Sequence, residues 1–166
     1  PNKVDYKISE NKKFGTVVIE PLEKGFGTTL GNALRRVLLS SLQGTAITSI
    51  KINGVLHEFS TIEGVREDVT DIIMNLKNVT FNSKSNHTQK LSLNIKGPKE
   101  VLSSDFDENP DVEIIDKDIV IMNVDSNREV NLEIFLDVNK GYISAEKNKD
   151  NENKSVGQMI LDSTFS

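Results

Sequence analysis

The chain has 166 residues, 36% of them hydrophobic and 27% charged, with a net charge of -5 at pH 7 and a pI near 5.1. This length allows one ordinary domain or two small ones with a buried core, and the acidic balance excludes a global basic field for nucleic acid. The lack of cysteine excludes disulfides and thiolate metal sites, and neither a signal peptide nor an apolar run of about 18 residues is present. We therefore expect a globular cytoplasmic protein without a metal or cofactor and without a membrane partner.

The first elements are a strand and a helix. A run of β-branched residues from Phe14 to Leu22 predicts a buried strand after a polar lead-in. A glycine-containing turn follows, and Thr28 or Thr29 is a suitable N-cap for a helix that continues through Leu42. Gly44 lies just past the last turn, where glycine commonly ends a helix.

A hairpin and a second helix are predicted next. The residues from Ala46 to Ile52 favour a strand, and those from Val55 to Phe59 favour its partner across an Asn-Gly pair, which is a strong hairpin signal. From Gly64 to Lys77 apolar residues recur at helical spacing. Acidic residues near the start of this segment and Lys77 at its end suit the helix dipole.

The second half of the chain is predicted to be mostly β. Short strand-like runs are separated by clusters of Asn, Asp, Ser, Gly and Pro, and the runs are "VTF", "LSLNI", "VEII", "IVIMNV" and "VNLEIFLDV". The composition of Lys147 to Lys154 is that of a charged loop.

Three glycines at the head of the first helix raise the possibility of nucleotide binding. Gly25, Gly27 and Gly31 follow a predicted strand, as in a dinucleotide-binding turn, but their spacing is G-x-G-x-x-x-G. The end of the next strand, around Ile52, also lacks the acidic residue that would hold a ribose hydroxyl. A tight turn with close backbone packing is the better interpretation, and a small nucleotide-binding protein is the alternative function.

The helix itself has two contrasting faces. Its apolar residues cover about half the circumference, wider than the stripe of a surface helix, and they are Leu30, Ala33, Leu34, Val37, Leu38 and Leu42. The remaining face combines a leucine with arginines and a small polar residue, namely Asn32, Arg35, Arg36 and Leu39. Arginine beside an apolar anchor is typical of a protein contact, although the pattern alone also allows an ordinary exposed face.

Two further segments carry weaker site signals. The acidic stretch from Asp105 to Asp111 could place carboxylates around Mg²⁺ or Ca²⁺, but it lacks the glycine and distal glutamate of a calcium hand, so a turn-rich acidic loop is favoured. His57 lies in a predicted strand beside Glu58, and no second histidine or suitably placed acid completes a catalytic triad. We interpret it as a structural histidine.

A family resemblance covers nearly the whole chain. The continuous stretch "VIEPLEKGFGTTLGNALRRVLLSSLQGTAITSIKINGVLHEFSTIEGVREDVTDIIMNLK" closely resembles the amino-terminal domain of the alpha subunit of bacterial DNA-directed RNA polymerase. The similarity resumes at "KGPKEV", "DVEII", "GYISAEKN" and "VGQMILDSTFS". It is weakest in the loops that contain "SSDFDENPD" and "KDNENK".

The resemblance implies an α+β fold, with part of an α/β dimerisation lobe in residues 1–52 and an inserted, mostly β lobe in residues 53–166. It implies that the apolar side of the first helix dimerises, and that Arg36 and Leu39 fall where the alpha dimer engages the large β and β′ subunits. The implied function is a non-catalytic assembly subunit of the nucleotidyltransferase complex, with no direct DNA contact by this chain.

Two departures from the family pattern qualify this expectation. The family continues past the position of Ser166 with a second dimerisation helix and a carboxy-terminal domain, so we expect a weakened dimer from this sequence. Lys99 stands where the family often has glycine, which affects the expected conformation of that turn.

The charge balance gives a first prediction. Because lysine and arginine contacts to phosphate supply most non-specific affinity, this chain should cause no shift of duplex DNA at physiological salt. An electrophoretic mobility assay over a salt series checks this. A clear shift that weakens with added salt would contradict it.

Overall fold

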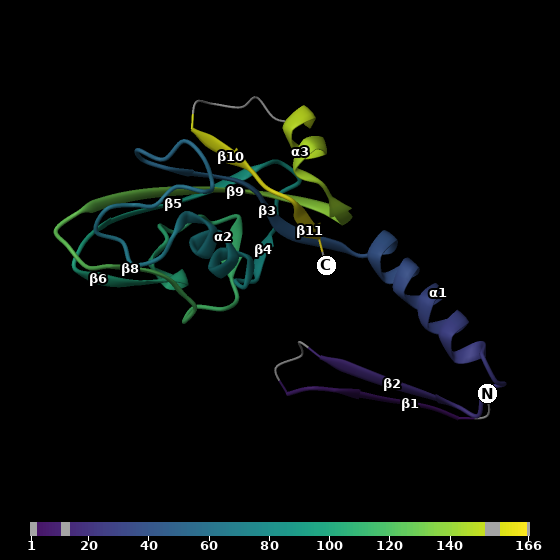
Figure 1. Ribbon diagram of the computed structural model, residues 1–166. Helices are drawn as coiled ribbons and strands as arrows, with labels where there is room; N and C mark the ends of the chain where they lie inside the picture. The colour runs from purple at the N-terminus through teal and green to yellow at the C-terminus, as the bar shows by residue number, and fades with distance from the viewer. Residues whose placement is uncertain (1–2, 11–13, 152–156, 166) are drawn as a thin grey trace. The chain divides into compact units, whose positions relative to one another are not determined.

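The structure is a computed structural model that describes residues 3–10, 14–151 and 157–165. It divides into two compact units, Pro1–Leu38 (unit 1) and Leu39–Ser166 (unit 2). The α+β fold class that was expected is confirmed, with helices set among mostly antiparallel strands (Figure 1).

Unit 1 contains an antiparallel hairpin and most of a helix. Strand β1 (Lys3–Ile8) pairs with β2 (Gly15–Glu20), and helix α1 spans Phe26–Ser41. The predicted buried strand is therefore present, but β2 is almost entirely exposed and its partner β1 was taken for a polar lead-in. The alternation of Val4, Tyr6 and Ile8 with charged residues is the sequence signal for β1.

Both ends of α1 differ from the expected ones. The helix begins at Phe26, whose N–H donates to the carbonyl of Glu23 at 3.0 Å, so neither threonine caps it. It ends at Ser41, and Gly44 lies inside strand β3 (Gln43–Ile52). The expected glycine stop was wrong because the residues after the helix enter the sheet directly.

Unit 2 is built on a sheet in the order β10-β3-β9-β11, with β5 pairing to β9. These strands are β5 (Gln89–Lys96), β9 (Glu129–Ile143), β10 (Gln158–Ile160) and β11 (Ser163–Phe165). In the view of Figure 1, α2 (Val69–Lys77) lies below β9 and α3 (Ala145–Asn151) above it. Two smaller antiparallel pairs complete the unit, β4 (Phe81–Ser83) with β7 (Val112–Ile114) and β6 (Lys99–Leu102) with β8 (Val120–Val124).

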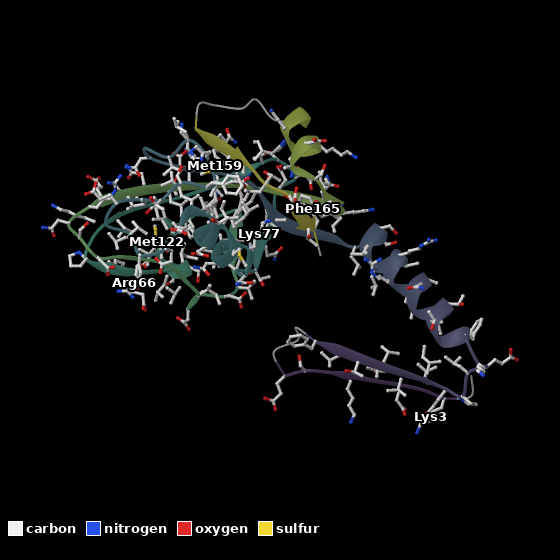
Figure 2. All side chains as sticks on the ribbon, in the orientation of Figure 1. Lys3, Arg66, Lys77, Met122, Met159 and Phe165 are labelled. Carbon is white, nitrogen blue, oxygen red and sulfur yellow. The ribbon has the colours of Figure 1, made fainter. Side chains whose placement is uncertain are left out.

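Apolar side chains that face each other across the strands form the core. Ile50 of β3 lies opposite Ile134 of β9, which in turn lies opposite Leu91 of β5, and all three are buried. Helix α2 adds Ile72 and Leu76, both fully buried. Figure 2 shows Met122 of β8 among these closely packed side chains. At roughly 1.5–3 kcal/mol for each large apolar side chain removed from water, this cluster supplies much of the stability of unit 2.

The predicted hairpin after β3 is wrong, although its turn exists. Gly54 has a φ of 76°, and the N–H of Val55 donates to the carbonyl of Ile52 at 3.1 Å. The residues from Val55 to Phe59 nevertheless form no strand. They cannot return along β3 because β9 and β10 already occupy its two edges.

The second helix is shorter than expected because its predicted first turn pairs with β8. The N–H of Arg66 donates to the carbonyl of Asn123 at 2.9 Å, and Val65 forms an isolated bridge with Val124. The Glu67 carboxylate then accepts hydrogen bonds from the backbone and side-chain nitrogens of Asn123 at 2.6 and 2.7 Å. The predicted charge order remains, with Asp71 in the first turn and Lys77 in the last.

The later strands agree with the predicted β-rich half, with differences in detail. The strand expected at "VTF" begins at Phe81, and β6, β10 and β11 were not anticipated. The charged loop expected from Lys147 is instead helical in α3 as far as Asn151, and residues 152–154 lie outside those that the structure describes. The lobe boundary between residues 52 and 53 stays a prediction.

Candidate assembly surface on helix α1

Helix α1 exposes its apolar side. All 16 residues of the helix are described, and none of them is buried. Leu34, Val37 and Leu38 are 46%, 57% and 54% exposed, and Ala33 is also exposed, whereas Leu30 is half-buried. Leu42, expected on the same side, follows the end of the helix and is 53% exposed. Contiguous apolar patches on a protein surface commonly mark interaction sites, so the apolar side of α1 is a candidate contact surface.

The predicted docking residues share the opposite face of the same helix. At 100° per residue, Asn32, Arg35, Arg36 and Leu39 fall within about 100° of arc, and the apolar residues of the helix occupy about 140° on the other side. The first three are exposed and Leu39 is half-buried. The structure therefore brings all four predicted residues together on one face.

The hairpin of unit 1 adds an apolar face that sequence reasoning missed. Val4 lies opposite Ile19 and Tyr6 opposite Val17, and residues opposite each other across an antiparallel pair share a face. Val4, Tyr6 and Val17 are 59%, 75% and 59% exposed. A two-stranded hairpin is marginally stable alone in water. A partner that covers this apolar face is therefore expected to stabilise the hairpin, and the same expectation holds for the apolar side of α1.

Strand β9 comes close to the backbone of Leu39 in the last turn of α1. Gly141 in β9 has a φ of 70°, and a Cβ atom there would lie 2.9 Å from the backbone oxygen of Leu39. Leu39 carries the half-buried side chain of the predicted docking face. Glycine at 141 therefore allows the two backbones to lie this close together.

Tyr142, the neighbour of Gly141, is held by an acidic residue. A hydrogen bond with Asp162 raises the pKa of the Tyr142 phenol above its ordinary value, and burial and the Asp162 charge add to the effect. Asp162 also accepts a hydrogen bond from the N–H of Ala145 at 2.7 Å. Asp162 lies between β10 and β11, so it links this segment to the end of β9 through Tyr142 and to the start of α3 through Ala145.

The glycine positions do not form a nucleotide-binding turn. Gly27 and Gly31 lie within α1 rather than in a loop before it, and the preceding strand β2 belongs to an antiparallel hairpin instead of a βαβ unit. Gly25 makes the expected tight turn with a φ of 83°. Close packing was expected at this point, but a Cβ atom at Gly27 or Gly31 would meet nothing within 4 Å.

The remaining candidates are His57 and the acidic residues that were considered for a metal site. His57 is exposed in a loop, not in a strand as expected, and its Nδ1 atom is 3.3 Å from the Ser60 hydroxyl. Among residues 3–10, 14–151 and 157–165, no three His, Asp or Glu side chains are grouped to hold a metal ion. No helix in the described part of the chain has both the length and the apolar character needed to cross a membrane.

Comparison with known proteins identifies the class. Residues 50–166 match the family model of the RNA polymerase Rpb3/RpoA insert domain, and the chain belongs to this family. It is also 46% identical over 160 residues to the DNA-directed RNA polymerase subunit alpha of Alkaliphilus metalliredigens (strain QYMF). That match covers 96% of this chain and 50% of the relative, so the chain spans about half the length of the curated relative it matches.

A glycine substitution tests the close approach of β9 to the backbone of Leu39. Gly141→Ala should lower the free energy of unfolding by about 1–3 kcal/mol, because it places a side chain at positive φ and against the backbone oxygen of Leu39. Gly54→Ala is the matched control, since its φ is 76° and a Cβ atom there would come no closer than 3.9 Å to another atom, a side-chain nitrogen of the flexible Arg128. Chemical denaturation of both variants measures the difference, and equal losses would show that the contact with Leu39 is unimportant.

Proposed function

We propose that this chain is a non-catalytic assembly part of bacterial DNA-directed RNA polymerase. In this proposal it dimerises through the apolar side of α1 and docks the large β and β′ subunits through the face that contains Arg36 and Leu39. It supplies no acid, base or metal ligand to nucleotidyl transfer, and it does not contact DNA itself.

The observation that carries this proposal is the pair of opposite, solvent-exposed faces on one helix. An apolar face that is self-complementary suits a two-fold contact between identical chains. Arginines around a partly buried leucine suit a different partner, because guanidinium groups form bidentate hydrogen bonds while the leucine is desolvated. Family membership and the alpha-subunit relative support the same role.

Substitutions on the docking face test binding of the large subunits. Arg36→Ala and Leu39→Asp should each weaken capture of a purified β or β′ subunit by about 2 kcal/mol, roughly 30-fold, if these residues are interface hot spots. Lys24→Ala is the control, because it removes a cation before the helix begins and outside both faces.

Circular dichroism must show that the variants remain folded, which matters most for the half-buried Leu39. Normal binding by folded Arg36→Ala and Leu39→Asp proteins would refute the docking assignment.

The apolar face predicts self-association. Sedimentation across a hundredfold concentration range should show exchange between monomer and dimer, because Leu34, Val37 and Leu38 lose water contact in the dimer. Val37→Asp should raise the dissociation constant at least tenfold. Asn32→Asp adds the same charge to the opposite face and should leave the dissociation constant nearly unchanged.

A monomer at every concentration would contradict the dimer proposal. Dimerisation of Val37→Asp as strong as that of the unsubstituted chain would show that the apolar side of α1 is not the contact.

A further inference from the structure

The negative charge of the chain is concentrated in one short segment. Residues 105–118 contain seven acidic residues and one lysine, so this segment carries more negative charge than the chain's net value of -5. The rest of the sequence is nearly balanced. Negative charge concentrated on one part of a protein surface attracts positively charged partners and increases the rate at which they associate.

The same segment lines a cavity of about 460 Å³ in unit 2. Its apolar wall is made by Leu91, Phe106, Val112 and Ile114, of which the first two are buried and the others half-buried. Phe106 also packs edge-on against Phe81, with ring centroids 6.5 Å apart and an interplanar angle of 75°. Leu91 and Phe106 therefore form the packed base of the cavity, and Val112 and Ile114 expose more of their apolar side chains to a ligand.

Hydrogen bonds hold the acidic segment against the edge of β5. The N–H of Asp107 donates to the carbonyl of Ser92 at 2.8 Å, and the side-chain amide of Asn109 donates to the carbonyl of Lys90 at 3.2 Å. The Asn109 side-chain oxygen accepts from the N–H of Asp111 at 2.9 Å. A segment fixed in this way loses little conformational entropy on binding.

Three carboxylates around the cavity are available to a ligand. Asp105 and Asp116 serve the fold, since Asp105 accepts from the N–H of Leu102 and pairs with Lys99, and Asp116 accepts from the N–H of Thr80. By contrast, three acidic side chains that line the cavity have no hydrogen-bond or ion-pair partner among the described residues, and these are Asp107, Glu108 and Glu113. Lys117 also lines the cavity but offsets only part of this charge.

We propose that this cavity docks a basic segment of another protein in which aliphatic side chains are flanked by lysine or arginine. The aliphatic groups bind against Leu91, Phe106 and Ile114, and the flanking cations face the unpaired carboxylates. Nucleic acid has the wrong charge for this surface. The acidic residues are not grouped as a metal site in the described part of the chain. The inference concerns residues outside α1 and does not rest on the proposed function.

A fluorescent peptide probe tests both parts of the proposed recognition. The capped hexapeptide Lys-Lys-Leu-Leu-Lys-Lys should bind the full chain, and its affinity should fall as ionic strength rises from about 0.01 to 0.15 M. The peptide Lys-Lys-Ser-Ser-Lys-Lys has the same charge and should bind at least about tenfold more weakly, because it lacks the apolar anchor. Amide chemical shifts should change at Leu91 and between Phe106 and Ile114.

Matched triple variants separate the cavity from overall charge. The substitutions Asp107→Asn, Glu108→Gln and Glu113→Gln together should weaken binding of the leucine probe at least about tenfold at low ionic strength. The control removes the same charge from exposed positions elsewhere in unit 2, through Glu63→Gln, Glu100→Gln and Glu146→Gln, and should change affinity by less than about twofold.

Three outcomes would overturn the proposal. The first is absence of binding by the unsubstituted chain, and the second is equal weakening by the two triple variants. The third is equal affinity for the leucine and serine probes. This comparison uses only the unsubstituted chain, so it does not depend on the folding of any variant.

Discussion

The antiparallel pairing of β3 with β9 is the contact on which the rest of unit 2 depends. It joins residues between 80 and 97 positions apart, such as Ile50 with Ile134 and Ile52 with Leu132, and these four side chains are almost completely buried. Closing so long a loop costs conformational entropy that grows only slowly with length, and burial of this apolar ladder offsets the cost. Strand β9 also approaches the backbone oxygen of Leu39 at Gly141 and pairs with β5, whose carbonyl groups accept hydrogen bonds from the acidic segment.

Unit 1 depends on contacts of another kind, because it buries little of its own apolar surface. Isolated helices of about 15 residues are marginal in water, and most helix stability in proteins comes from packing of an apolar face. Helix α1 has 16 residues and no buried one, and the apolar face of the hairpin is also exposed. A segment with this composition gains stability when another surface covers it, which is consistent with an assembly role.

The sequence alone was sufficient to predict those helices and strands whose apolar residues recur with the period of the element itself. The periodicity of α1 predicted a helix with two different faces, and the runs around β8 and β9 predicted strands. Irregular spacing of Ile47 relative to Ile50 also has a simple cause, since the register with β9 shifts between Ile47 and Ser49.

Prediction failed where a distant strand decided the local structure. The Asn53-Gly54 turn forms, but no sheet edge is available for a returning strand, because β10 arrives from about 100 residues further along the chain. Residues 64–67 have helical spacing but pair with β8. Asp105 to Asp111 was predicted as a loop, and its composition did not reveal that it covers the edge of β5 beside a cavity.

Charge and apolar area have separate roles in the surfaces of this chain. Residues 1–39 hold seven basic and four acidic residues, whereas residues 105–118 are strongly acidic. Each of these regions also offers apolar groups, Leu39 among the arginines of α1 and Phe106 in the wall of the cavity. Apolar burial supplies most of the free energy of association, and charge complementarity decides which partner approaches and at what rate. Because the two proposed surfaces have opposite charge, a single partner segment would not suit both, and the proposals therefore assign chemically different segments to the arginine face and to the acidic cavity.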